Sequence, residues 1–204
     1  NLIKPIIFEK KNNNFEIEQL YQIGYLGFSI ASFIASQCGI PLVDSALFDT
    51  RILDSNKFFL PNAYCLSDIF KKFGYLNIFI SSDDLDESNQ YTFLKTHGYQ
   101  EIFGIKELGN LGYETSKKAY YNRNKFPKGG IHDSELLKAA TNKFDELQKY
   151  NKKPYLLTIV TLDTHVPTFA NPDCINNLRN SKKLITEKRF EESFVCLSLS
   201  LNKF

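Results

Sequence analysis

The sequence contains no methionine, and it starts at Asn1. Because no initiator residue is present, we expect the chain to be part of a longer protein, in which a signal peptide cannot be sought. Long apolar runs are also missing. Stretches such as Tyr155 to Leu162 have the length of a strand and fall well short of the ~20 residues of a membrane-spanning helix. These absences predict a chain that is soluble by itself, with membrane contact only through segments outside it.

The chain also lacks a large net charge. The 25 Lys and Arg residues nearly balance the 23 Asp and Glu residues, and the two signs are interspersed along the chain. Domains that bind nucleic acid usually concentrate basic residues on one face. The sequence therefore gives no electrostatic case for a nucleic-acid partner.

The cysteines do not have the spacing of a zinc site. Cys38, Cys65, Cys174 and Cys196 form no Cys-x-x-Cys pair and have no nearby histidines in a zinc pattern. Their even number permits two disulfides, but four reduced, buried thiols fit the composition equally well. Composition alone leaves the redox state open.

The 204 residues, of which 43% are hydrophobic, suffice for one core, so we expect a single domain over 1–204. Short helices alternate with apolar strands, which predicts an α/β fold with a doubly wound, mostly parallel sheet. Residues 113–130 show no sustained period and are predicted to be a surface excursion. The predicted helices are 29–37, 68–73, 91–97, 133–150 and one from about residue 187; the predicted strands are 16–21, 76–80, 100–104 and 155–162.

In such folds ligands bind beyond the carboxyl ends of the strands. Asp163 and His165 follow a predicted strand, and Ser29 opens a helix after another. A serine at a helix N-terminus suits an oxygen nucleophile that attacks phosphorus, because the helix dipole and the free amides favour an arriving anion. From spacing alone, Ser29 fits a simple helix cap better.

The remaining polar groups have structural interpretations. His165 fits a loop histidine satisfied by solvent or a carbonyl, and Asp163 with His165 supplies too few ligands for a metal site. His97 precedes Gly98 at a helix end, where an imidazolium suits the dipole. His132 and Asp133 fit the start of the long helix. The acidic residues 83–87 fit a solvated loop better than a cation site.

Several stretches, taken in order, resemble the periplasmic phosphoglycerol transferases that decorate osmoregulated glucans, within the sulfatase and alkaline phosphatase superfamily. Lipoteichoic acid synthases and phosphoethanolamine transferases are the broader relatives. The resemblance covers most of the chain, and its most specific motif is ASQCGIPL. The matching stretches are SIASFIASQCGIPL (29–42), FFLPNAYCLSDIFKKFGY (58–75), FLKTHGY (93–99), FDELQKYNKKPYLLTIVTLDTHVP (144–167) and the later Cys196.

This resemblance implies a three-layer α/β/α sandwich, incomplete in this chain, and a metal-dependent transfer through a covalent phospho-enzyme. Ser29 stands at the position of the nucleophile, which is also a ligand of a divalent metal (Mn, Zn or Mg). Ser32 and Ser36 are the fallback nucleophiles. His165 matches the histidine that contacts the substrate's phosphoryl oxygens, and Asp163 lies beside it as a second substrate contact.

The resemblance also implies the partners and the location. They are a phospholipid-derived donor and a glycan acceptor, at the periplasmic face of the inner membrane of a Gram-negative bacterium. The matching cysteine positions imply the disulfide pairs Cys38–Cys65 and Cys174–Cys196, which suit an oxidising compartment.

The sequence departs from the family in two respects. The upstream carboxylate and the downstream Asp-His pair of the family's metal site are not in this chain. Acidic residues such as Asp86 and Glu87 stand where relatives have basic ones, and they repel a phosphate donor unless a cation intervenes. Two alternatives therefore stay open. One is a degenerate domain that binds a glycan or phospholipid head group without catalysis, and the other is an unrelated structural α/β domain with free thiols.

Overall fold

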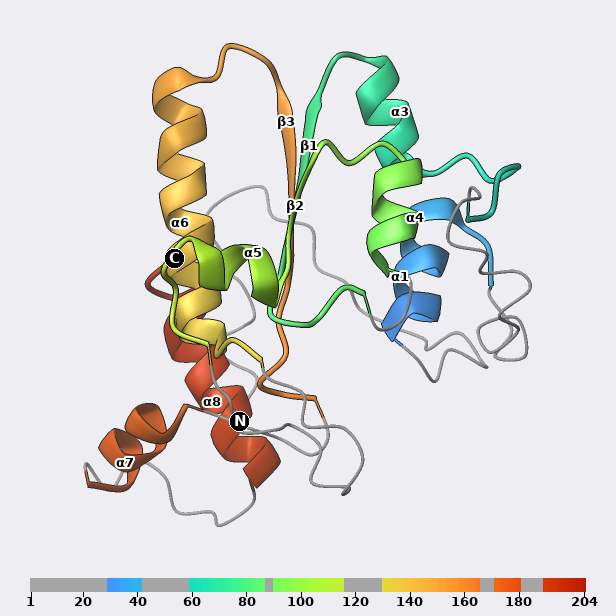
Figure 1. The fold of residues 1–204 in the computed structure, drawn as a ribbon. Helices are drawn as coiled ribbons and strands as arrows, with labels where there is room; N and C mark the ends of the chain where they lie inside the picture. The colour runs from blue at the N-terminus through green and yellow to red at the C-terminus, as the bar shows by residue number, and fades with distance from the viewer. Residues whose placement is uncertain (1–28, 42–58, 87–89, 116–129, 166–170, 181–188) are drawn as a thin grey trace, which may run out of the picture.

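A computed structural model describes residues 29–41, 59–86, 90–115, 130–165, 171–180 and 189–204. In this part of the chain, helices lie on both faces of a small sheet (Figure 1). The elements are α1 (Ser29–Cys38), α3 (Leu66–Lys72), β1 (Leu76–Ser81), α4 (Gln90–Thr96), β2 (Glu101–Phe103), α5 (Ile105–Asn110), α6 (Asp133–Tyr150), β3 (Tyr155–Val160), α7 (Pro172–Asn180) and α8 (Arg189–Leu201).

The strands form a parallel sheet in the order β2-β1-β3. Ile80 of the central strand β1 is in register with Phe103 of β2 and with Ile159 of β3. Because the strands are parallel, their carboxyl ends lie at one edge of the sheet. The α/β architecture predicted from the alternation of helices and strands is confirmed.

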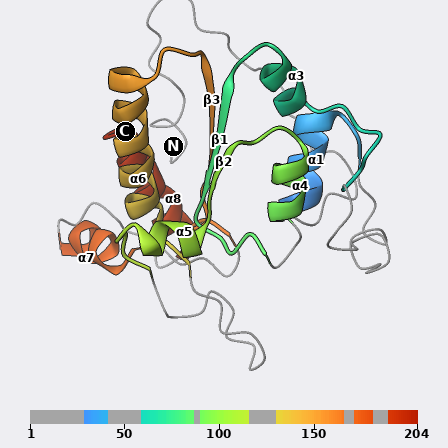
Figure 2. The ribbon, with the colours of Figure 1, turned by 45° about the horizontal axis from the view of Figure 1, so that its top comes forward.

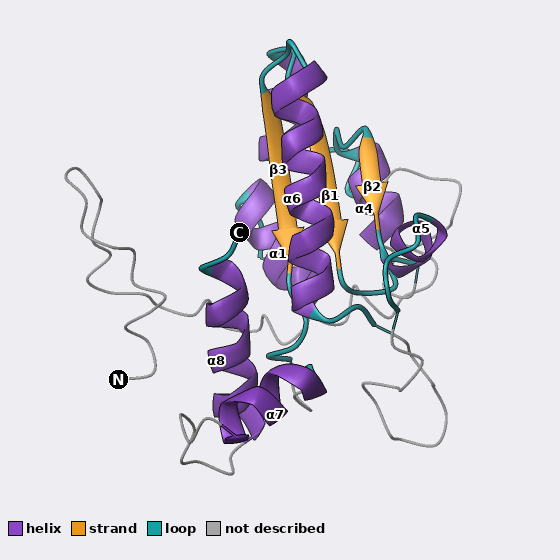
Figure 3. Cartoon of the chain, turned by 90° about the vertical axis from the view of Figure 1, so that its left-hand side faces the viewer, coloured by secondary structure: helices purple, strands orange, loops and turns teal. Residues whose placement is uncertain are grey.

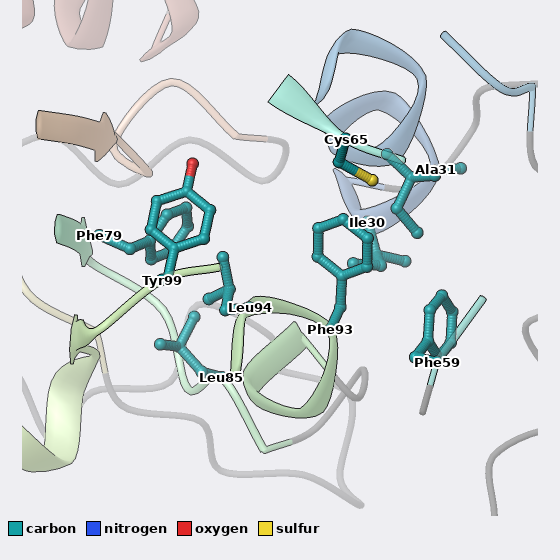
Figure 4. Packing of buried hydrophobic residues seen from close by; sticks show 10 residues of the cluster. Ile30, Ala31, Phe59, Cys65, Phe79, Leu85, Phe93, Leu94 and Tyr99 are labelled. Atoms are coloured by element: carbon teal, nitrogen blue, oxygen red, sulfur yellow. The ribbon is translucent and has the colours of Figure 1, made fainter. Parts of the chain in front are cut away.

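One face of the sheet is covered by α1, α3 and α4 (Figure 2). Alternate side chains of a strand point to opposite faces, and Phe79 of β1 points to this one. It packs edge-on against Phe33 of α1 and Tyr99, with ring centroids 5.3 and 5.5 Å away. Phe93 of α4 lies beside Ile30 of α1 in the same cluster (Figure 4). This core fixes α1, and therefore residue 29, against the sheet.

The opposite face is covered by α6, which lies lengthwise over β3 and β1 (Figure 3). Ile78 and Ile80 of β1 pack there with Leu136 and Ala140 of α6. The predicted helix 133–150 is confirmed, but Phe144, which the pattern assigned to the buried face, is 40% exposed. Its ring instead meets the half-buried Tyr155 at the sheet's border, at a centroid distance of 6.5 Å.

Two disulfides tie elements that the sheet does not join directly. Cys38, the last residue of α1, is bonded to Cys65, which precedes α3, and Cys174 of α7 is bonded to Cys196 of α8. Both pairings implied by the family resemblance are present. The free-thiol alternative is wrong, since no cysteine is left reduced.

Removing either disulfide should lower the free energy of unfolding by about 3.5 kcal/mol, because the bridges close loops of 27 and 22 residues and the cost depends only weakly on loop length. We expect the double variants Cys38→Ser/Cys65→Ser and Cys174→Ser/Cys196→Ser to show nearly equal losses in chemical denaturation. Free thiols in the unreduced wild-type protein, or unchanged unfolding in both variants, would contradict the pairing.

Some predicted boundaries were wrong. The helix predicted at 68–73 with Ser67 as its cap begins at Leu66, because Cys65 is the N-cap and its backbone N–H donates to Asp68 Oδ2 at 3.0 Å. Ser67 is instead buried within the first turn. The short helices α5 and α7 were not predicted. The predicted strand 16–21 and most of the excursion 113–130 lie outside the described residues.

No helix in the described ranges combines the length and the apolar character that crossing a membrane requires.

Candidate active site at the carboxyl edge of the sheet

A small cavity lies where β1 and β3 end. Its volume is about 70 Å³, and Phe33 and Phe79 give it an apolar side. Its polar lining comes from separate elements: Ser81 and Asp83 at the end of β1, Gln90 of α4, and Thr161 and His165 after β3. Typical ligand pockets measure about 300 to 1,000 Å³. The cavity can therefore receive a small polar group of a substrate, but not a whole glycan or lipid.

The N-terminus of helix α1 points toward this edge. The Tyr99 hydroxyl lies 3.4 Å from Gln37 Oε1 and 3.0 Å from Thr158 Oγ1 in the body of β3, whereas Phe33 lies at the cavity beside Val160, where β3 ends. Going backward along α1, from residue 37 to residue 33, therefore leads in the direction of the carboxyl end of β3. Ser29 is the first residue of α1 and comes one further turn along the same direction.

Burial raises the pKa of Tyr99 to about 12, although its hydrogen bond with Thr158 acts in the opposite direction. The phenol is therefore neutral at physiological pH. Tyr99 serves as a fixed contact between α1 and the sheet, not as an acid or base.

The structure places the three candidate serines differently. The backbone of Ser29 is described at the start of α1, but its side chain lies outside the described part. Ser32 and Ser36 are on the exposed side of the helix, and Ser36 Oγ donates to the Phe33 carbonyl at 2.7 Å. The nucleophilic role of Ser29 and the fallback role of the other two remain predictions.

His165 closes a turn that follows β3. Its backbone N–H donates to the Leu162 carbonyl at 2.8 Å, and its half-buried side chain lines the cavity. The turn therefore places an imidazole at the carboxyl edge, in the same cavity that Phe33 of α1 lines.

Asp163 lies in the same turn but is only 2% exposed. Its Oδ2 accepts the backbone N–H of Asp133 at 3.1 Å, and its Oδ1 lies 3.1 Å from His132 Nδ1. Both carboxylate oxygens thus contact the N-terminus of α6. The substrate contact predicted for Asp163 remains a prediction, and the contacts in the structure are structural.

The Asp133 carboxylate in turn accepts backbone N–H groups from the segment after β3. Its Oδ1 accepts the Leu162 N–H at 2.7 Å, and its Oδ2 accepts the Asp163 N–H at 3.2 Å. The predicted role of His132 and Asp133 at the helix start is confirmed, with His132 as the N-cap. Burial, together with the Asp163 carboxylate, raises the pKa of Asp133 to about 7, although the two N–H groups and His132 act in the opposite direction.

This raised pKa predicts a pH dependence of stability. Between about pH 4 and pH 7 the folded protein holds a proton on Asp133 that the unfolded chain has released. The free energy of unfolding should therefore fall as pH rises through this window. We expect this decline in the wild type and a flatter profile in Asp133→Asn, measured by chemical denaturation at each pH. A parallel decline in both proteins would contradict the assignment.

His97 is a buried bridge, not an exposed helix cap. Its Nδ1 lies 2.9 Å from Asp68 Oδ2, and its Nε2 lies 2.6 Å from the Phe59 carbonyl oxygen. The prediction of a simple dipole interaction was wrong, because the side chain turns inward at 3% exposure. Cys65, Asp68 and His97 are close enough for a metal, but the Cys65 sulfur is in a disulfide. This cluster is structural.

The described residues do not fit a complete divalent-metal site at the carboxyl edge. In the ranges that the structure covers, the group around His97 is the sole cluster of three or more His, Cys, Asp or Glu ligands, and it lies away from the lining of the cavity. A metal held by Ser29 needs further ligands from elsewhere.

The acidic loop after β1 is partly neutralised. Lys106 of α5 lies 3.5 Å from Asp84 Oδ1 and also pairs with Asp86 Oδ2. The hydrogen bond to Asp86 raises the pKa of Lys106. Because this ammonium offsets carboxylate charge, the loop repels a phosphate donor less than the sequence suggested.

Comparison with known proteins identifies the family of the chain. The family model described as Sulfatase matches residues 53–192. Phosphoglycerol transferase I of Escherichia coli (strain SMS-3-5 / SECEC) is 32% identical over 199 residues, which are 97% of this chain and 24% of the relative. The protein of that name from Citrobacter koseri gives the same values. The chain thus spans about a quarter of the length of these relatives.

Two solved structures share the fold. An alkaline phosphatase superfamily protein from Vibrio parahaemolyticus matches with a TM-score of 0.58 at 18% identity, over 85% of this chain and 38% of that one. The lipoteichoic acid synthase LtaP from Listeria monocytogenes matches with a TM-score of 0.53 at 12% identity, over the same shares. These similarities support the sandwich architecture alone.

Proposed function

Because the chain belongs to the sulfatase family, we propose that it is part of a phosphoglycerol transferase that works through a phospho-enzyme on Ser29. The observation that supports this most directly is the arrangement at the carboxyl edge of the sheet. The N-terminus of α1 points to this edge, and the His165 side chain lines the small cavity there. In this proposal residues 1–204 belong to a single catalytic domain that the rest of the protein completes.

In the first step the Ser29 oxygen attacks the phosphorus of a phospholipid-derived donor. A bond between the Ser29 oxygen and phosphorus forms, the bond from phosphorus to the leaving oxygen breaks, and the proton of the Ser29 hydroxyl ends on the leaving alcohol. In the second step a sugar hydroxyl of the glycan attacks phosphorus and releases Ser29. The free amides at the start of α1 favour the phosphoryl anion.

His165 contributes by donating a hydrogen bond to a phosphoryl oxygen. Negative charge on these oxygens is redistributed in the transition state, and a donor held in place beforehand stabilises it without reorganisation. The imidazole suits this role because it lines the cavity from the turn after β3. The cavity's volume of about 70 Å³ suits a phosphoryl group, with the glycan and the lipid remaining outside.

Ser29 is also the proposed ligand of a divalent cation, Mn, Zn or Mg. The described residues do not complete such a site, so we derive no catalytic step through it. The two disulfides support a location at the periplasmic face of the inner membrane, where oxidising conditions preserve them.

The alternative is a domain that binds a glycan or phospholipid head group without turnover. The acidic residues Asp86 and Glu87 after β1 favour it, because they repel a phosphate donor. The complete protein, incubated with a labelled phosphatidylglycerol donor and a periplasmic glucan, distinguishes the two. Transfer of the label that a chelator abolishes supports the enzyme; binding of the glucan or the lipid without transfer supports the binding domain.

A further inference from the structure

A pair of buried carboxylates connects two segments that lie 30 residues apart. Asp133 is the first residue of α6, and Asp163 lies in the turn after β3. Each accepts a backbone N–H from the other: Asp133 N donates to Asp163 Oδ2 at 3.1 Å, and Asp163 N donates to Asp133 Oδ2 at 3.2 Å. The two residues are 1% and 2% exposed.

The contacts concentrate on the turn that carries His165. Asp133 holds both the Leu162 and the Asp163 N–H groups, and the turn then closes through the bond from His165 N to the Leu162 carbonyl. The N–H groups three and two residues before His165 are therefore fixed to α6, whose own position is set by its packing on β1.

A separate hydrogen bond joins a later residue, Asn171, to the first turn of α6. Asn171 Nδ2 donates to Ser134 Oγ at 3.2 Å. Residues on both sides of 166–170 are thus attached to the first turn of α6. Simple helix capping does not require this arrangement, since one acceptor side chain suffices for a cap.

We propose that Asp133 and Asp163 form a reciprocal carboxylate brace that positions His165 at the cavity. This rests on the proposed function, because His165 is the group whose placement matters there. This role requires no contact of Asp133 or Asp163 with donor or acceptor, because it acts by holding the turn. A displacement of about 1 Å in a group that contacts the transition state can lower turnover about a hundredfold.

The hydrogen bonds predict an asymmetry between two conservative variants. Both oxygens of Asp133 accept N–H groups, one from Leu162 and one from Asp163. In Asp133→Asn one of these oxygens becomes an NH₂ group, which cannot accept the N–H that faces it. Asp163 accepts the Asp133 N–H and faces His132 Nδ1, which accepts a hydrogen bond when the imidazole is neutral and protonated at Nε2. Asp163→Asn can therefore keep both contacts with the amide correctly oriented.

The test uses the complete protein with a chromogenic p-nitrophenyl ester of glycerol phosphate. We expect Asp133→Asn to lower kcat by about ten- to a hundredfold with KM changed less than about twofold, and Asp163→Asn to lower kcat only a few-fold. Asp145→Asn, an exposed position on α6, is the matched control and should keep wild-type kinetics. Wild-type kinetics in Asp133→Asn, equal to those of the control, overturn the proposal.

Amide hydrogen exchange supplies a readout that does not depend on activity. The Leu162 and Asp163 amides should lose protection in Asp133→Asn, while core amides such as that of Ile80 keep it. Unchanged protection in the turn overturns the brace, and lost protection with wild-type kcat overturns its positioning role. If Asp133→Asn does not fold, Asp163→Ala, which removes both acceptor oxygens of Asp163, takes its place, and wild-type protection and kinetics in that variant overturn the proposal. A wild-type protein without turnover contradicts the proposed function, and the exchange result then decides whether the brace holds the turn.

Discussion

The complete protein carrying Ser29→Ala should lose transfer activity by about a thousandfold or more, because without the hydroxyl no phospho-enzyme can form. Its melting temperature should stay close to that of the wild type. The α1 contacts that hold the core come from Ile30, Phe33 and Ile34, which the substitution leaves in place. Initial rates with a labelled donor, together with thermal denaturation, measure both quantities.

Ser36→Ala is the matched control for this result. Ser36 lies on the same helix, is exposed, and bonds only locally to the Phe33 carbonyl among its described contacts. We expect it to retain wild-type activity. Retained activity in Ser29→Ala, with loss in Ser32→Ala or Ser36→Ala, would move the nucleophile to one of the fallback positions.

The second large effect is expected at His165. His165→Ala should lower kcat by about a hundredfold while KM changes little, since a hydrogen-bond donor to the phosphoryl oxygens matters most in the transition state. Thr164→Ala, in the same turn, is the control and should leave kcat nearly unchanged. Steady-state kinetics over a range of donor concentrations separates kcat from KM.

A rise in KM that accounts for the whole loss in His165→Ala would show ground-state binding instead. His165→Gln tests the chemistry further, because the amide retains a donor of different reach. Partial recovery of kcat relative to His165→Ala is expected from a donor role.

The sheet and the long helix could be predicted because their signals are local. Residues 76–80 and 155–160 are apolar and rich in residues that favour strands, and the α6 sequence repeats apolar residues along one face. Helix α7 also had a readable signal. Asn171 precedes Pro172, and its side chain caps the helix by accepting the Asp173 N–H at 2.9 Å. The apolar stripe is too short for periodicity alone to identify α7.

The site could be predicted only in part. The family resemblance gave the disulfide pairs, which are confirmed, and it assigned roles to Ser29 and His165, which stay predictions. The Asp133–Asp163 pair could not be found this way, because each residue alone fits a helix start or a loop. Likewise, the inward turn of His97 depends on Asp68, 29 residues earlier. Such interactions depend on three-dimensional packing, which local patterns do not contain.

The measurement that tests the central claim most directly is peptide mapping of the complete protein after brief incubation with the phosphoglycerol donor and an acid quench. We predict one phosphoglyceryl group on the peptide that contains Ser29, absent from Ser29→Ala and discharged when the glucan acceptor is added before the quench. Turnover without any such adduct, or an adduct on another residue that persists in Ser29→Ala, would contradict the account.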